Sequence, residues 1–248
     1  MIAFRPDLRL RSRIGFAEGP IALLDWDGTL RGGFTIQDWA DQLVSDGLIG
    51  ADVPGHLVEL VRAYGRGDLD HDNLADSSAR LLASHLRGVL VERVIGAANR
   101  FVEHDAERLL PYAEGLIDLL GNRGLPTVIL SGAPDEVLAA YQRKLHFSAH
   151  AGLLLTSVRG QYDGGIGQNP GTAEQKEAGI RDLEKRQLHP HVAFGDSISD
   201  IPMWRAARLR FLIGDDVPVD PALHLVSITG ALADLDVIEA VMRSGEIG

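Results

Sequence analysis

Residues 21–30, Ile-Ala-Leu-Leu-Asp-Trp-Asp-Gly-Thr-Leu, join a short apolar run to two carboxylates that are one residue apart. The run at 21–24 predicts a buried strand, and Gly28 predicts the turn that follows it. Asp25 and Asp27 are therefore expected at the carboxyl end of the strand, where open α/β sheets bind their ligands. Two acids at this place suit a hard cation and an activated oxygen nucleophile.

The composition is that of an ordinary globular protein, with 45% hydrophobic and 24% charged residues in a chain of 248. Its net charge of −11 argues against nucleic acid or an anionic membrane as a partner. The absence of cysteine excludes disulfides, zinc–thiolate sites and a thiol nucleophile. With no apolar run of membrane length and no secretory signal pattern, we expect a cytoplasmic protein. A small basic run, at Arg5, Arg9, Arg11 and Arg13, is interpreted as a solvated N-terminal segment.

A helical insert is predicted directly after the first strand. From about residue 35 to residue 108, apolar residues recur at helical spacing, as at Trp39, Leu43 and Val44, and no stretch has the pattern of a strand. We therefore expect a helical cap domain over 33–110, inserted into a core made of 1–32 and 111–248. Gly32 and Gly33 are the candidate hinge about which this cap closes over a substrate.

An α/β rhythm follows the insert. Strands are expected over 127–130, 149–158, 192–194 and 209–213, with a Gly-rich turn or small hairpin at 160–167. Helices are expected over 113–122, 134–145, 172–187, 201–207 and 231–242. Alternating elements of this kind predict a doubly wound, Rossmann-like parallel sheet that is covered on both faces.

Polar groups of complementary chemistry follow several of these elements. Besides the first acid pair, Ser131 and Gly132 follow the second strand, Lys176 begins a helix, and Asp196 and Asp200 follow the strand at 192–194. A parallel sheet brings such groups to one crevice. Carboxylates can hold Mg²⁺, and a hydroxyl, a lysine and free N–H groups can hold a phosphoryl group. The set fits phosphoryl transfer through an aspartyl phosphate.

These motifs, in this order, resemble the haloacid dehalogenase (HAD) superfamily on its phosphatase branch. The likeness covers residues 20–30 and 111–215. The helical insert and the run Gly-Asp-Ser-Ile-Ser-Asp-Ile-Pro-Met at 195–203 resemble the phosphoserine-phosphatase-like subgroup, which has a helical C1-type cap. The resemblance implies a Mg²⁺-dependent phosphoric monoester hydrolase that acts on a small phosphorylated metabolite.

The resemblance also implies roles for the acids. Asp25 is the nucleophile, and Asp27 protonates the leaving oxygen and then deprotonates the attacking water. Mg²⁺ is held by the Asp25 carboxylate, the Asp27 backbone carbonyl and Asp196. Because the acid must hold a proton near neutral pH, the Asp27 side chain is expected off the metal, with a raised pKa.

The phosphate site is implied in the same way. Ser131 and the Gly132 N–H hold phosphate oxygens, with Gly28 and Thr29 beside them. Lys176 neutralises charge between nucleophile and phosphate, and Asp200 orients Lys176 or a metal-bound water.

Structural interpretations compete with several of these roles. Ser131 has the sequence context of a helix N-cap, and Asp200 precedes a helix start at Ile201-Pro202. Lys144 and Lys185 compete with Lys176 for the cationic role. The histidines show no spacing typical of a metal site.

Phosphoserine itself is disfavoured as the substrate. The segment 30–34, Leu-Arg-Gly-Gly-Phe, lacks the Glu that phosphoserine phosphatases typically use to bind the substrate amine, and Ser-Gly-Ala replaces Ser-Gly-Gly at 131–133. Candidate substrate contacts are Arg31, Phe34, Tyr64 and Arg66. Other functions remain open: a phosphomutase or phosphotransferase that uses the same aspartyl phosphate, a signalling receiver, or a non-catalytic protein that binds a phosphorylated ligand. The sequence does not indicate the oligomeric state.

Overall fold

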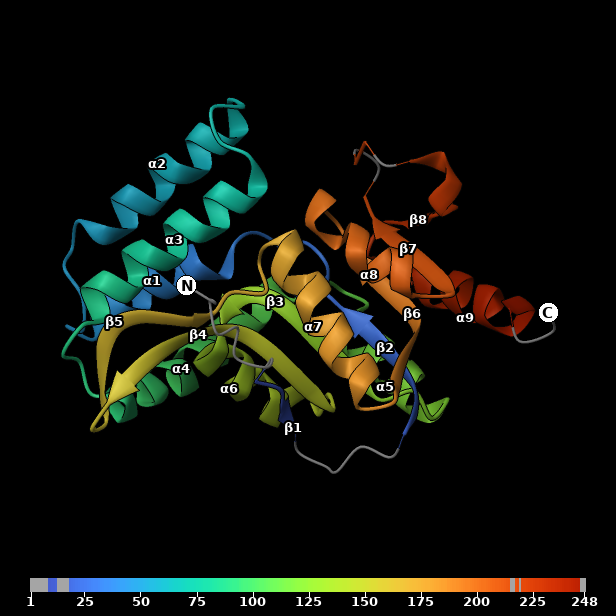
Figure 1. Ribbon diagram of the computed structural model, residues 1–248, viewed down its shortest axis with the longest axis horizontal. Helices are drawn as coiled ribbons and strands as arrows, with labels where there is room; N and C mark the ends of the chain where they lie inside the picture. The colour runs from blue at the N-terminus through green and yellow to red at the C-terminus, as the bar shows by residue number, and fades with distance from the viewer. Residues whose placement is uncertain (1–8, 13–17, 215–216, 219, 246–248) are drawn as a thin grey trace.

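A mostly parallel sheet lies at the centre of the computed structural model, which describes residues 9–12, 18–214, 217–218 and 220–245 (Figure 1). The strand order is β1-β4-β3-β2-β6-β7-β8, with β5 paired to β4. The strands are β1 (Arg11–Ser12), β2 (Gly19–Leu24), β3 (Thr127–Pro134), β4 (Ala149–Val158), β5 (Gln161–Gln168), β6 (Leu188–Gly195), β7 (Leu209–Ile213) and β8 (Val226–Ile228). Strands β1 and β5 pair antiparallel with β4, and the other pairs are parallel. The predicted α/β class is confirmed.

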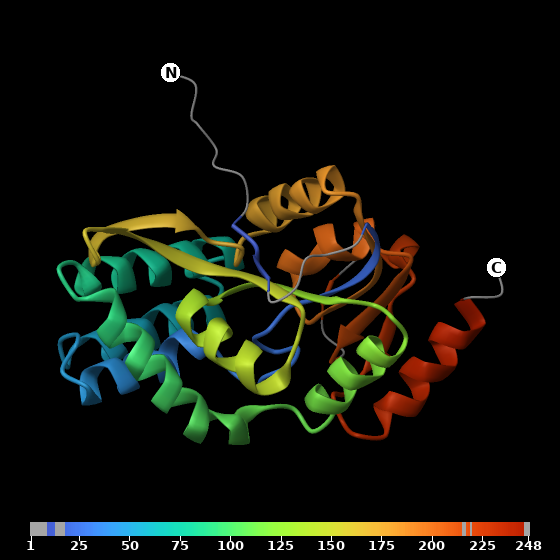
Figure 2. The same ribbon diagram turned by 90° about the horizontal axis from the view of Figure 1, so that it is seen from below.

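Helices cover both faces of this sheet because its central strands are buried on both sides. Ile21 and Leu23 of β2 belong to a core shared with α7 (Ala173–Lys185) and α8 (Ile201–Ala206). Ala22 and Leu24, on the opposite face, belong to the core of α5 (Ala113–Asn122), α6 (Asp135–Leu145) and α9 (Asp234–Gly245). Figure 2 shows the orange α7 and α8 on one side of the sheet and the green α5 and red α9 on the other. A continuous apolar run is what a doubly covered strand requires.

The insert between β2 and β3 is helical, as predicted. It consists of α1 (Thr35–Ser45), α2 (Val53–Gly65), α3 (His71–Leu86) and α4 (Val91–Asp105), followed by a short turn η1 (Ala106–Arg108). Asp70 caps α3 by accepting a 2.7 Å hydrogen bond from the Asn73 N–H. Trp39 of α1 packs edge-on against Phe101 of α4, with ring centroids 5.4 Å apart. The buried apolar side chains of the insert belong to the same cluster as those of β2, α5 and α6, so the insert packs continuously against the core.

The insert is also joined to the core by the β4–β5 hairpin. The expected turn or small hairpin at 160–167 is the second strand of this hairpin, which runs alongside α3 of the insert (Figure 1). The Gly88 N–H donates to the Tyr162 carbonyl at 2.7 Å, the Tyr162 N–H to the Val89 carbonyl at 3.0 Å, and the Val91 N–H to the Gly160 carbonyl at 2.9 Å. The loop between α3 and α4 therefore adds an edge contact to β5.

The N-terminal residues that the structure describes form part of the sheet. β1 pairs with β4, and the Arg11 guanidinium lies 2.7 Å from Oδ2 of the buried Asp135. Arg11 is half-exposed, in line with a solvated segment, but it also has a defined partner in Asp135. Arg5 and Arg13 lie outside the described residues. The short strands β1 and β8 carry too few residues for a sequence pattern to reveal them. No helix in the described part of the chain has the length and apolar character needed to cross a membrane.

Candidate active site

The carboxyl ends of β2 and β3 present the first two motifs side by side. The two strands are parallel neighbours, with Leu24 opposite Ile129. The register between β3 and β4 shifts between Leu130 and Pro134, so the strand is irregular at Ser131. The Ser131 hydroxyl accepts a 3.3 Å hydrogen bond from the Ala133 N–H. It lies within the strand and does not cap α6.

Gly28 allows the loop after β2 to approach the loop after β6. Its φ is +74°, and a Cβ at this position would overlap Oδ2 of Asp196. Any side chain here would displace that carboxylate. Thr29 also serves Asp196, since its hydroxyl donates to Oδ1 at 3.3 Å. Thr29 is fully buried and is not part of the cavity wall, whereas Gly28 is.

Lys176 forms a buried ion-pair network with two of the predicted acids. Its Nζ lies 3.2 Å from Oδ2 of Asp25 and also contacts Oδ1 of Asp200, and the side chain is 1% exposed. The two carboxylates raise the pKa of Lys176, although burial alone would lower it. The lysine is therefore a fixed positive charge beside Asp25.

Asp200 is held by the loop after β6 as well as by Lys176. Its Oδ2 accepts hydrogen bonds from the N–H groups of Asp196 and Ser197, both at 3.0 Å. Asp200 thus contacts Lys176, as the expected orienting role requires, and it also closes the capping box of the short turn η2 (Ile198–Asp200). The neighbouring Lys185 instead pairs with Asp182 at the surface.

Asp25, Asp196 and Asp200 can converge on one cation. Their carboxylate oxygens lie within 4.8 Å of one another. Oδ1 of Asp25 is buried and has no hydrogen-bond partner among the described residues. Burial and the neighbouring acids raise the pKa of Asp196 to about 8, and burial raises that of Asp25 to about 6 against the lowering effect of Lys176. A divalent cation with oxygen ligands fits this cluster, because it would offset the repulsion.

The side chain of Asp27 is not part of this acidic cluster. Its carboxylate accepts hydrogen bonds from the Thr35 N–H and also contacts the Thr35 hydroxyl. Burial raises the pKa of Asp27 to about 7, against the lowering effects of Thr35 and Arg31. The two neighbouring aspartates thus have different partners. One faces Lys176 and the acids, and the other is held by the start of the insert.

A cavity of about 850 Å³ lies between this cluster and the insert. Its floor includes Asp25, Asp27, Ser131, Gly132 and Lys176. The insert and the loops after β6 and β7 provide its walls. The space is much larger than a phosphate group alone requires.

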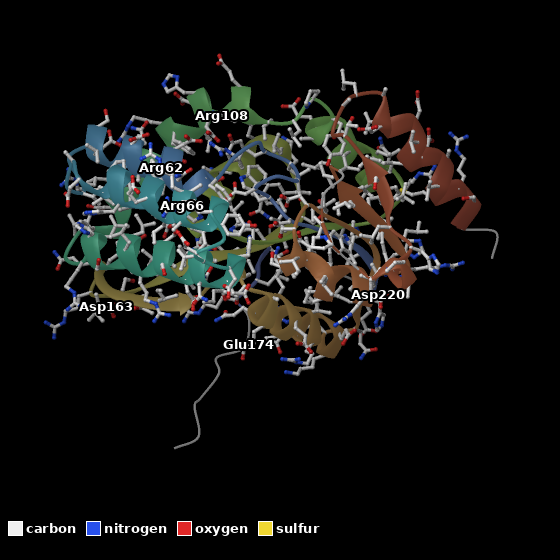
Figure 3. The ribbon with its side chains drawn as sticks, turned by 90° about the horizontal axis from the view of Figure 1, so that it is seen from above. Arg62, Arg66, Arg108, Asp163, Glu174 and Asp220 are labelled. Carbon is white, nitrogen blue, oxygen red and sulfur yellow. The ribbon has the colours of Figure 1, made fainter. Side chains whose placement is uncertain are left out.

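The structure separates the four candidate substrate contacts. Phe34 and Tyr64 line the cavity. Arg31 is fully buried, donates to Asp105 from Nε at 2.9 Å, and contacts Asp38. Arg66 is exposed on the surface of the insert and pairs with Asp68 at 2.8 Å (Figure 3). Neither arginine lines the cavity.

Sequence reasoning missed three residues at the site. Thr35 holds the Asp27 carboxylate, and His71 lines the cavity at the start of α3. Gly171 approaches so closely that a Cβ on Gly132 would lie 3.0 Å from its Cα. These three residues come from segments outside the motifs, and their contacts with the site arise only in the fold.

The sequence of the turn before α7 predicted the start of the helix but not the contact of this turn with Gly132. Thr172 was recognisable as a helix N-cap, and its hydroxyl does cap α7, accepting from the Gln175 N–H at 3.3 Å. Nothing local in the turn at Pro170-Gly171 indicated that it would lie against Gly132.

Solved structures share this fold. A protein of unknown function from Bordetella pertussis Tohama I matches with a TM-score of 0.70 and 20% identity over 86% of this chain and 100% of its own. A phospho-aspartyl intermediate analogue of phosphoserine phosphatase matches with a TM-score of 0.57 and 21% identity, over 88% of this chain and 98% of its own. A phosphoserine phosphohydrolase-like protein from Francisella tularensis subsp. tularensis SCHU S4 matches with a TM-score of 0.62 and 13% identity, over 89% of this chain and 99% of its own.

These identities are low, so the structural likeness concerns the fold. A search of curated proteins by sequence finds no match. A family model gives the direct assignment, since it matches residues 22–205, from the strand before Asp25 to α8 beyond Asp200. The chain belongs to the haloacid dehalogenase-like hydrolases.

Proposed function

We propose that the chain is a Mg²⁺-dependent phosphomonoester hydrolase that works through a phospho-aspartyl intermediate on Asp25. The observation that carries the proposal is the division between the two acids after β2. Asp25 lies 3.2 Å from the Lys176 ammonium, whereas Asp27 is bound to Thr35. A nucleophilic carboxylate must be ionised and a general acid must hold a proton. The charge of Lys176 favours the ionised form of Asp25, and burial favours the protonated form of Asp27 against the hydrogen bonds from Thr35.

In the first half-reaction an oxygen of Asp25 attacks phosphorus. The bond between phosphorus and the ester oxygen breaks, and Asp27 gives its proton to that leaving oxygen. In the second half-reaction Asp27 takes a proton from water as the water oxygen attacks phosphorus. The bond to Asp25 then breaks, which releases phosphate and leaves Asp27 protonated again. The second half-reaction thus returns the proton to Asp27 and frees the carboxylate of Asp25.

Positive charge at the site stabilises the transferring group. Lys176, Ser131 and Gly132 line the cavity beside Asp25, and their ammonium, hydroxyl and N–H groups could hold phosphate oxygens. The carboxylates of Asp25 and Asp196 and the backbone carbonyl of Asp27 would hold Mg²⁺, with Asp200 beside them in the same acidic cluster. When bound, Mg²⁺ would supply further charge neutralisation to the phosphoryl oxygens.

The substrate is proposed to be a small phosphorylated metabolite other than phosphoserine. Arg31, which follows the first motif where phosphoserine phosphatases typically carry their amine-binding Glu, is fully buried and paired with Asp105. This position therefore provides no carboxylate that could bind a substrate amine.

The test is phosphate release from a panel of phosphomonoesters and p-nitrophenyl phosphate, with Mg²⁺ or with EDTA. Asp25→Asn should abolish release, whereas Asp163→Asn on the exposed β4–β5 hairpin should retain it (Figure 3). Acid-quenched wild type should carry one phosphoryl group on the peptide that contains Asp25. Release that persists in Asp25→Asn would overturn the proposal. Transfer of the group to an added sugar phosphate, without release, would indicate a phosphotransferase.

A further inference from the structure

Residues 169–173 lie between the insert and the floor of the cavity. A Cβ on Gly171 would lie 2.9 Å from the Gly132 Cα on one side and 3.3 Å from the Ala75 Cβ of α3 on the other. The backbone of this segment therefore passes closely between the two. It leads directly into α7, which carries Lys176 near its start. The positions of Gly132 and Lys176 thus both depend on where residues 169–173 lie.

The side chain of Asn169 is the buried centre of the hydrogen bonds that hold this segment. It is 2% exposed, its Nδ2 donates to Oδ1 of Asp76 on α3 at 3.2 Å, and its Oδ1 accepts from the Gly171 N–H at 3.3 Å. An ionised carboxylate can only accept and an N–H can only donate, so these two partners fix the orientation of the amide. The same Oδ1 lies 3.6 Å from the place that a Cβ on Gly132 would take. One buried side chain therefore joins the insert to the segment behind Gly132.

The start of α7 is held by the same helix of the insert. Asp72 of α3 accepts a 3.1 Å hydrogen bond from the N–H of Ala173, the first residue of α7. A carboxylate of the insert thus satisfies one of the N–H groups that a helix leaves free at its N-terminus. The Asn169 N–H donates to Oε1 of Gln175 at 3.0 Å, which ties the segment to α7 as well. The insert therefore holds α7 at the end that carries Lys176.

We infer that Asn169 is a positioning residue, which couples the docking of α3 to the placement of Gly132 and Lys176 on the cavity floor. This inference rests on the proposed phosphatase activity and makes the phosphate site of that activity depend on the insert. A transferring phosphoryl group needs the N–H and ammonium groups around it at fixed positions, and small displacements of such groups cost much of their effect. Asn169 acts through these groups and does not itself contact the substrate.

The first experiment compares two substitutions of Asp76 that remove the same charge. Asp76→Asn keeps an oxygen that can accept from the Asn169 Nδ2, whereas Asp76→Ala leaves this buried amide without its partner on α3. We expect kcat/KM for p-nitrophenyl phosphate to fall about tenfold in Asp76→Ala and less than about threefold in Asp76→Asn. Because Asp76 also pairs with Arg80 at the surface, Arg80→Ala is the control, and it should retain the activity of the wild type.

The second experiment reverses the direction of this hydrogen bond. Asn169→Asp places a second carboxylate opposite Asp76, and we expect kcat/KM to fall at least about tenfold. Adding Asp76→Asn returns a donor to the pair and should restore most of the activity. The matched control is Asn99→Asp on α4, where an exposed Asn contacts Arg143, and this variant should behave as the wild type does.

Inorganic phosphate gives a readout that does not require turnover. Its effect on Tm reports the affinity of the cavity floor for phosphate, and Asp76→Ala should need about ten times more phosphate than the wild type for the same rise in Tm. Asp76→Asn should need the same concentration as the wild type.

Two results would overturn the inference. One is that Asp76→Ala and Asp76→Asn have equal phosphate affinity and equal kcat/KM, and the other is a loss in Asn169→Asp that Asp76→Asn does not repair. If the wild type released phosphate from no ester, the proposed function would fail instead. The titration with inorganic phosphate would then decide by itself whether the insert acts on the cavity floor.

Discussion

The Thr35 N–H donates to both carboxylate oxygens of Asp27, each at 3.0 Å, and the Thr35 hydroxyl contacts the same carboxylate. Trp26 Nε1 donates to that hydroxyl at 3.1 Å, so the hydroxyl hydrogen is directed toward Asp27. Thr35 is the first residue of α1, and Asp27 follows β2. The insert therefore holds the side chain that is proposed to protonate the leaving oxygen.

Thr35→Val should weaken the protonation of the leaving oxygen, because Asp27 keeps its carboxyl group but loses one of the contacts that hold it in place. The variant keeps the backbone hydrogen bonds but loses the hydroxyl, and we expect kcat for an alkyl phosphate to fall about tenfold or more. The loss should be smaller for p-nitrophenyl phosphate, whose leaving group needs little protonation. Thr35→Ser restores the hydroxyl and should recover most of the activity. Steady-state kinetics on both esters measure this, and equal losses on the two would contradict the role.

Mg²⁺ should stabilise the folded protein through the acidic cluster. One carboxylate oxygen of each of the three residues lies within 4.8 Å of the others, so their charges repel one another. A bound cation should therefore raise Tm. The expected gain in the free energy of unfolding is about 1–3 kcal/mol at 10–100 times the Kd of the cation. At pH 9 in EDTA, above the pKa of about 8 of Asp196, Asp196→Asn should raise Tm because it removes one of the repelling charges. The variant should also lose most of the response to Mg²⁺. Thermal unfolding with and without Mg²⁺ measures both effects. The control Asp163→Asn should respond to Mg²⁺ as the wild type does, and an unchanged Mg²⁺ response in Asp196→Asn would rule out this cation site.

The convergence of the residues on the cavity floor was predictable because the ends of strands are visible in the local sequence. Asp25, Ser131 and Asp196 each follow an apolar run, and parallel strands place such ends together. Lys176 was harder to predict, since three lysines lie near candidate motifs. Its burial against Asp25 and Asp200 distinguishes it, and no local pattern encodes that burial.

The insert shows where sequence reasoning fails. Arg31 has the sequence position of a substrate contact, but its partner Asp105 is 74 residues away in the chain. A pairing across a whole inserted domain has no periodic signal. The same holds for His71 and for the walls of the cavity, which form only because the insert packs above the sheet.

The Arg31–Asp105 pair should contribute strongly to stability. Arg31 is fully buried, and Asp105 is 6% exposed and also accepts a 2.6 Å hydrogen bond from the Tyr141 hydroxyl. Arg31→Met should lower the free energy of unfolding by about 3–5 kcal/mol, because it leaves Asp105 charged and buried. Adding Asp105→Asn should recover part of that loss. Arg66→Met, which breaks only the exposed pair with Asp68, should cost about 1 kcal/mol or less. Denaturant unfolding measures these values, and similar losses for the two arginine variants would contradict the argument.

Glu136 should make stability depend on pH. It is 7% exposed, and its Oε1 accepts a 2.5 Å hydrogen bond from the Tyr162 hydroxyl. Burial raises the pKa of Glu136 above its ordinary value of 4.5, so its protonated form stabilises the fold below pH 4.5 and that stability is lost as pH rises through the folded pKa. Glu136→Gln has no carboxyl group to ionise at this position, so it does not lose this stability as pH rises. Its free energy of unfolding relative to wild type should therefore increase from pH 4.5 to pH 8, by about 1.4 kcal/mol for each pH unit by which the folded pKa exceeds the unfolded one. Urea unfolding at both pH values measures this, with the exposed Glu174→Gln as the control, and a constant difference would show that Glu136 is ionised normally.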